Sequence, residues 1–66
     1  MYVIADKLNV RTGPGTNYTA VDSLSYGHEV VVDTSSYTNG FYFVMYSENT
    51  EIHRGWISSD YIAKFI

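Results

Sequence analysis

The feature that most constrains this chain is an alternation of apolar and polar residues with a period of two, broken at short intervals by turn-forming residues. The alternation is clearest at residues 8–11, 30–33 and 41–46. A period of two places successive side chains on opposite faces of a strand. No stretch has the apolar spacing at i, i+3, i+4 and i+7 that is typical of an amphipathic helix. The pattern therefore predicts an all-β fold.

Turn signals separate the predicted strands, since glycine, asparagine and serine favour reversals. They occur at Gly13–Gly15, Ser25–Gly27, Asn39–Gly40, Ser47–Thr50 and Ser58–Asp60. Many short strands with regular turns predict a small barrel or sandwich, and at this length only a barrel hides its strand edges.

Two of these reversals carry more detailed expectations. Asn39–Gly40 predicts a hairpin between strands at Glu29–Thr34 and Phe41–Ser47. The segment Ser58–Asp60 predicts one helical turn capped by a serine hydroxyl, and Ile62–Phe65 a closing strand.

The 66 residues provide for one domain spanning the whole chain, 1–66, with a thin core. There is no cysteine, so neither a disulfide framework nor a thiolate metal site is available. Aromatic residues make up 17% of the chain and suit packing on a pleated sheet. We expect the stability to come from close packing of aromatic and branched side chains.

Charge and hydropathy argue against several classes of protein. The net charge is −3, and the four cations Lys7, Arg11, Arg54 and Lys64 do not cluster, which disfavours nucleic-acid binding. No apolar run reaches the ~18 residues of a membrane span. The first residues lack the pattern of a signal peptide, so the chain as written is expected to stay in the cytoplasm, and its compartment is open if it belongs to a larger protein.

The residues that catalysis would require are missing from the pattern. There is no cysteine nucleophile, and His28 and His53 lie in different segments without a recognisable carboxylate partner. No metalloprotease, P-loop or serine-hydrolase motif occurs. We therefore expect no enzyme activity, no cofactor and no metal site.

A series of motifs resembles one known family. The segments are LNVRTGPGTNY at Leu8–Tyr18, Leu24 with Gly27, Val30–Val32, Gly40–Tyr46 and GWISSDYI at Gly55–Ile62. Together, and in this order, they are similar to the bacterial SH3-like (SH3b) domains over about Ala5 to Ile62. The resemblance implies a barrel of five to six short antiparallel strands with one short helical turn. It also implies a non-catalytic module, of a kind often appended to peptidoglycan hydrolases, phage endolysins and envelope proteins.

The strand phase predicts which side chains form the core. The inward positions are Leu8, Val10, Val30, Val32, Val44 and Ile57. Burial of each is worth ~1.5–3 kcal/mol.

The resemblance also implies a shallow groove beside the Arg11–Tyr18 loop that accepts an extended cell-wall peptide. Its expected residues are Asn9, Arg11, Tyr18, Phe41, Trp56 and Tyr61. For Asn9 and Arg11 the alternative role is to brace the glycine-rich loop, and for Trp56 it is core packing. The expected ligand is uncharged or weakly basic, because a negative domain does not favour an anionic polymer.

Three departures from the family pattern stand out. Phe41 replaces a tryptophan, and the reversal between Tyr46 and Gly55 is extended, either as a tolerated loop insertion or as a contact with a partner. Phe43 and Met45 occupy outward positions that are usually polar in the family.

The outward apolar residues raise a second functional hypothesis. Phe41, Phe43 and Met45 share one strand face, and Val31 on the paired strand extends it into an apolar patch of roughly a few hundred Å². Either the terminal segments Tyr2–Ile4 and Phe65–Ile66 cover this patch, or it is used. Its use would be a homo-oligomer, or docking to another domain of a longer chain. The chain would then be a protein interaction or assembly domain that does not bind peptidoglycan.

Overall fold

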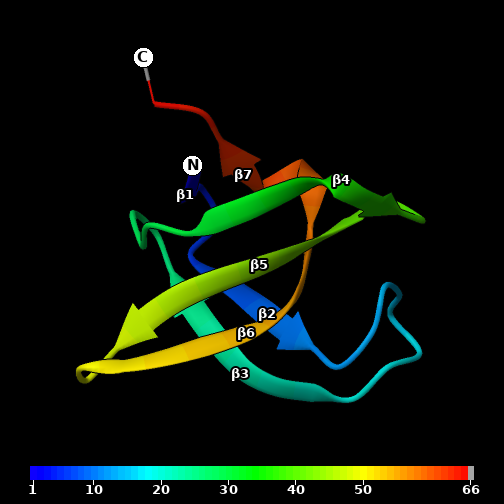
Figure 1. The fold of residues 1–66 in the computed structure, drawn as a ribbon, viewed down its shortest axis with the longest axis horizontal. Coiled ribbons are helices and arrows are strands. Elements are labelled where there is room, and N and C mark those ends of the chain that lie inside the picture. The colour runs from blue at the N-terminus through cyan, green and yellow to red at the C-terminus, as the bar shows by residue number, and fades with distance from the viewer. Residues whose placement is uncertain (66) are drawn as a thin grey trace.

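The computed structural model describes residues 1–65, which form seven strands and one 3₁₀ turn (Figure 1). The strands are β1 (Tyr2–Val3), β2 (Lys7–Arg11), β3 (Ala20–Ser25), β4 (Val31–Thr38), β5 (Phe41–Glu48), β6 (Glu51–Ser58) and β7 (Ile62–Ala63). The 3₁₀ turn η1 (Ser59–Tyr61) precedes β7. The predicted all-β, SH3-like architecture with one short helical turn is confirmed.

The strands form one large antiparallel sheet and one small one. The large sheet has the order β3-β2-β6-β5-β4, and β1 pairs with β7 beside it (Figure 1). The number of strands within residues 1–65 exceeds the expected five to six, because two short strands, β1 and β7, of two residues each, accompany five longer ones. The large sheet bends around the core, so that β2 and β3 lie across from β4 and β5 (Figure 1).

The hairpin between β4 and β5 closes at Asn39–Gly40, as predicted. Both residues have positive φ values, 53° and 83°, which matches the turn type that suits the twist of a hairpin. The β4 strand runs further than expected, to Thr38, because it contains a bulge. Asp33 pairs with Phe43 but Thr38 with Phe41, so four residues of β4 face a single residue of β5.

The extended reversal between Tyr46 and Gly55 is not a loop insertion. The strands β5 and β6 remain paired as far as Glu48 opposite Glu51, and only Asn49 and Thr50 form the turn. Their φ values of 53° and 65° allow a two-residue connection. The additional residues therefore lengthen a regular hairpin that projects at one end of the sheet (Figure 1).

The core lies between the bent layers of the large sheet. Its buried residues within 1–65 are Val3, Leu8, Val10, Leu24, Val30, Phe41, Val44, Tyr46 and Ile57. Val32 is partly buried against the same cluster. All six predicted inward positions thus pack in the core, which confirms the strand phases.

Phe41 corrects the predicted apolar face. We expected it to share an outward face with Phe43 and Met45, but only 9% of its surface is exposed. The backbone N–H of Ser59 donates to the carbonyl of Gly40 at 2.8 Å, so η1 is docked against the hairpin tip beside Phe41. Phe41 is therefore buried although its strand phase is outward.

The C-terminal segment partly follows the prediction. The Ser58 hydroxyl accepts from the Asp60 N–H at 3.3 Å and caps η1. The closing strand spans only Ile62–Ala63 instead of Ile62–Phe65, and Ile66 lies outside the described residues. Beyond β7, the ring of Phe65 packs on Tyr2 with a centroid distance of 5.1 Å.

Gly55 generates a testable prediction about stability. A Cβ at this position would clash with Cγ1 of the fully buried Val10 and would lie 3.1 Å from the Arg11 carbonyl oxygen. Since neither group can move freely, we expect Gly55→Ala to lower the free energy of unfolding by ~1–3 kcal/mol. Chemical denaturation monitored by tryptophan fluorescence measures this change.

Gly15→Ala is the matched control. A Cβ there meets its nearest atoms at 3.5 Å, an ordinary van der Waals distance, so the unfolding free energy should change by no more than ~0.5 kcal/mol. Equal effects of the two substitutions would contradict the close approach of β6 and β2 at Gly55.

Candidate functional site

A groove lies where the start of β2, the glycine-rich loop, the β4–β5 hairpin tip and η1 meet. Its volume is about 590 Å³. It is lined by Ala5, Lys7, Leu8, Asn9, Arg11, Thr16, Asn39, Gly40, Phe41, Ser58, Asp60 and Tyr61. The segments that carry the sequence motifs therefore converge on one concave surface.

Arg11 shapes one wall of the groove through the loop that follows β2. Its Nη1 donates to the carbonyl of Tyr18 at 2.9 Å and to that of Thr16 at 3.3 Å. The Thr12 N–H also donates to the Thr19 carbonyl at 3.0 Å, which closes the base of the loop. Arg11 thus braces the loop, one of the two roles considered for it, and it is also one of the residues that line the groove.

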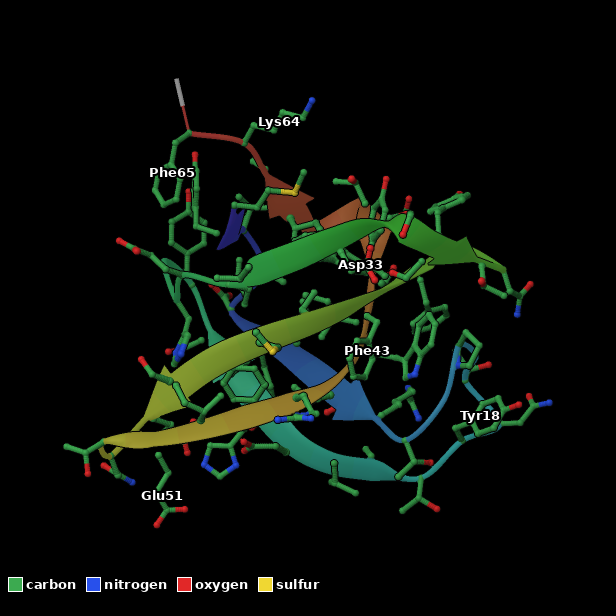
Figure 2. The ribbon with its side chains drawn as sticks, in the orientation of Figure 1. Tyr18, Asp33, Phe43, Glu51, Lys64 and Phe65 are labelled. Atoms are coloured by element: carbon green, nitrogen blue, oxygen red, sulfur yellow. The ribbon has the colours of Figure 1, made fainter. Side chains whose placement is uncertain are left out.

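Tyr18 packs on its own loop instead of lining the groove. A Cβ on Gly13 would clash with the Tyr18 ring, and one on Gly15 would lie 3.5 Å from it. The ring therefore covers the glycines while 47% of the residue remains exposed at the end of the molecule (Figure 2). Asn39 ties the hairpin tip to the same loop, since its Nδ2 donates to the Pro14 carbonyl at 3.2 Å.

The opposite wall comes from η1. Tyr61 is half exposed, and its carbonyl accepts from the Ile4 N–H at 2.9 Å, which fixes the backbone below its ring. Phe41 supplies a buried apolar surface between the two walls. An aromatic ring with an open face beside an apolar floor can pack against a ligand and hydrogen-bond to it through the tyrosine hydroxyl.

The groove carries charges of both signs. Lys7 and Arg11 are positive and Asp60 is negative. Among residues 1–65 the one side-chain contact within ion-pair distance is that of His53 with Glu51 at 3.9 Å, which is an ion pair only when His53 is protonated, so Lys7, Arg11 and Asp60 are not paired with each other. Lys7 and Asp60 can therefore meet a ligand that has both carboxylate and ammonium groups, whereas Arg11 Nη1 is already bonded to the loop.

Four of the six residues expected in the groove line it, and two do not. Asn9, Arg11, Phe41 and Tyr61 are brought together. Tyr18 and Trp56 are not among the lining residues: Tyr18 covers its loop, and Trp56 packs against Phe43 with a centroid distance of 5.5 Å. That a ligand contacts all six of these residues remains a prediction.

Sequence reasoning missed several lining residues, notably Lys7, Asn39, Ser58 and Asp60. They lie in four separate segments and form no motif with one another. Only the pairing of β2 with β6 and the docking of η1 on the hairpin tip bring them together. The turn signal at Asn39 and the capping signal at Ser58 were recognised, but as structural features.

Comparison with known families identifies the family of the chain. The family model described as bacterial SH3 domain matches residues 6–63, nearly the whole chain. The chain belongs to the bacterial SH3 domain family. Members of this family are generally binding modules. No curated protein and no solved structure matches the chain in the corresponding comparisons.

This bacterial SH3 domain has a second hollow, next to the outward face of β4 and β5. Its volume is about 400 Å³, and it is lined by Met1, Glu29, Val30, Val31, Met45, Tyr46, Ser47, Ile52 and Phe65. Val31 and Met45 are 68% and 41% exposed, so the terminal segments within residues 1–65 do not cover them. Phe65 is one of the lining residues, and 58% of its surface remains exposed.

A titratable cluster lies near the projecting end of the hairpin. The buried Tyr46 donates its hydroxyl to Asp22 Oδ2 at 2.8 Å, and its ring packs between His28 and His53. This hydrogen bond, together with one from the Ser23 N–H, lowers the pKa of Asp22. Burial raises the pKa of Tyr46, and the hydrogen bond to Asp22 adds to the rise.

The described residues offer neither a metal site nor a membrane span. No group of three or more histidine, cysteine, aspartate or glutamate side chains in residues 1–65 is placed to hold a metal ion. No helix in this part of the chain could cross a bilayer.

The Tyr46–Asp22 hydrogen bond predicts a pH-dependent effect of Tyr46→Phe. At neutral pH the substitution should cost ~1 kcal/mol of unfolding free energy. The lowered pKa of Asp22 means that this contribution is present above its ordinary value of 3.8 and is lost as the pH falls below it. Because the pKa of Tyr46 is raised in the folded protein, the contribution of the hydrogen bond to stability is also lost as the pH rises above 10.0, the ordinary pKa of tyrosine.

Denaturation curves between pH 2 and 11 measure the difference between wild type and Tyr46→Phe. That difference should be largest between about pH 4 and pH 10. Tyr26→Phe is the control, because Tyr26 is 63% exposed on a turn and should show no effect. A constant difference at all pH values would contradict the role of the hydrogen bond.

Proposed function

We propose that the groove binds an extended peptide of the bacterial cell wall, and that the domain is a non-catalytic binding module. The observation that carries the proposal is the convergence of the family motifs on one groove that has the exposed Tyr61 on one wall and the braced loop on the other. Membership of a family of binding modules supports the general class. The cell-wall ligand follows from the resemblance to domains that are appended to wall hydrolases.

The charges of the groove refine the expected ligand. Lys7 and Asp60 line the same groove with opposite signs. Peptides of the wall carry both free carboxylates and free amino groups, so one ligand can meet both side chains. The net charge alone predicts an uncharged or weakly basic peptide. The charges of the groove extend this expectation to a peptide that carries both positive and negative groups.

The groove is open and shallow, which determines the expected affinity. A ligand bound in the groove would keep one face in contact with water, and its contact with an exposed aromatic ring would be with Tyr61. Few buried anchors give weak binding, and most of the binding energy should come from one or two side chains. We therefore expect dissociation constants of roughly 0.1–1 mM for a single short peptide.

The test is a titration of soluble peptidoglycan fragments monitored by amide chemical shifts. The shifts should map to residues 7–18, 39–41 and 58–61, which surround the groove. Tyr61→Ala should weaken binding by about 5- to 30-fold, because it removes the exposed aromatic wall. Tyr26→Ala is the matched control, since it removes another exposed tyrosine, 63% against 50% for Tyr61, from a turn that does not line the groove.

Two results would refute this assignment. Shifts confined to residues 48–54 would place the ligand on the projecting hairpin instead. An absence of shifts with every wall fragment, together with no retention on purified insoluble peptidoglycan, would leave protein interaction as the function of the domain.

The second candidate function is protein interaction or assembly through the outward face of β4 and β5. The exposure of Val31 and Met45 on neighbouring strands favours it. It requires no wall ligand, and the domain would then act without binding peptidoglycan.

A further inference from the structure

The outward side of β4, β5 and β6 has an ordered arrangement of apolar and charged residues, which we call the outer face. Its members are Val31, Asp33, Phe43, Met45, Ile52, Arg54 and Trp56. Their neighbours Val32, Val44, Gly55 and Ile57 point inward and pack in or against the core. Alternation along each strand therefore places all seven on the opposite side.

Strand register arranges the outer face in rows. Val31, Met45 and Arg54 are paired in one row, and Asp33, Phe43 and Trp56 in the next. Asp33 and Phe43 can be followed on neighbouring strands in Figure 2. Apolar side chains thus occupy the middle of the face, while Asp33 and Arg54 lie at opposite corners. Arg11 of β2 pairs with Trp56 at the end of the second row, but its Nη1 is hydrogen-bonded to the carbonyls of Thr16 and Tyr18.

The two charged corners do not neutralise each other within one copy. The Cα atoms of Asp33 and Arg54 lie two strands apart across the sheet and two residues apart along the strand direction, which separates them by roughly 12 Å. The one side-chain ion pair among residues 1–65 involves neither Asp33 nor Arg54. Asp33 Oδ1 accepts from the N–H and the hydroxyl of Ser35, at 3.1 and 2.6 Å, which fixes the carboxylate while Oδ2 makes no hydrogen bond to residues 1–65.

We propose that the outer face is the interface of a symmetric homodimer, in which Asp33 of each copy pairs with Arg54 of the other. When the outer faces of two copies lie against each other, the two-fold axis runs between them, perpendicular to the line that joins Asp33 to Arg54. Rotation about this axis places Asp33 of each copy opposite Arg54 of the other. One rotation therefore forms both ion pairs and stacks the apolar middle of one copy on that of the other. A surface that complements itself in this way is what an isologous interface requires.

The exposed area indicates how strong such a dimer is. Val31, Met45 and Ile52 are 68%, 41% and 64% exposed, which gives an apolar patch of roughly a few hundred Å². A standard interface buries about 800 Å² per partner, of which about 57% is apolar. The outer face is therefore at the lower end of the range for a specific dimer, and we expect a dissociation constant of roughly 0.1 mM.

Sedimentation velocity between about 10 µM and 1 mM tests the dimer, with charge reversals as the main variants. Arg54→Asp places two carboxylates opposite each other, and Asp33→Lys places two cations opposite each other. Each should weaken the dimer about tenfold or more. The double variant Asp33→Lys, Arg54→Asp recreates the pairs with exchanged signs and should restore the affinity to within about threefold of wild type.

Three further variants keep the test decisive. Asp33→Asn retains the Oδ1 acceptor for Ser35 and removes only the charge, so it should weaken the dimer about 3- to 10-fold even if Asp33→Lys disturbs the bulge. Met45→Lys places a charge in the apolar middle and should give a folded monomer. Lys7→Glu changes the net charge as much as Arg54→Asp does, but it lies in the groove and should leave the dimer intact.

A wild-type protein that remains monomeric at 1 mM overturns the proposal, and the face is then open to a different partner. Failure of the double charge exchange to restore the dimer overturns the pairing of Asp33 with Arg54. An equal loss with Lys7→Glu would show that net charge, and not this pair, controls association. None of these results depends on whether the groove binds wall peptides.

Discussion

The structure depends on the contact between β2 and β6, where the two halves of the sheet meet. Arg11 and Trp56 are the paired residues at this junction, and Gly55 next to them leaves the space that the Val10 side chain fills. Any side chain at residue 55 would push the strands apart. The junction also connects two surfaces, because Arg11 braces the loop of the groove while Trp56 packs against Phe43 on the outer face.

The groove and the outer face therefore differ in how they are built. The groove is formed by loops and chain reversals that are held in place by backbone hydrogen bonds, such as that from Ser59 N–H to the Gly40 carbonyl. The outer face is formed by regular strands, so its side chains have a fixed spacing. Irregular backbone suits the recognition of an extended peptide by hydrogen bonds, whereas paired strands hold the side chains of the outer face in a fixed register.

Most of the fold could be predicted from alternation and turn residues, because both are local. Leu8 and Val10 were placed in the core, and the Asn39–Gly40 hairpin was recognised, on this basis. The burial of Phe41 was missed because alternation along β5 places it on the same side as the outward Phe43 and Met45. The reversal at Ser47–Thr50 was predicted, but its tight form, a two-residue turn at Asn49–Thr50, was not, because a threonine with positive φ is rare.

The candidate site was less predictable than the fold for the same reason. Asn9, Arg11 and Tyr61 belong to motifs and were found. Lys7 and Asp60 belong to none, and no local pattern shows that they line one groove. The junction of β2 with β6 has a further consequence for the folding reaction. The β5–β6 hairpin can form from neighbouring residues, but Arg11 and Trp56 meet only after most of the chain has been enclosed in a loop. Closing that loop costs entropy before Val10 packs on Gly55, so this small domain should fold slowly for its size, in roughly milliseconds to seconds.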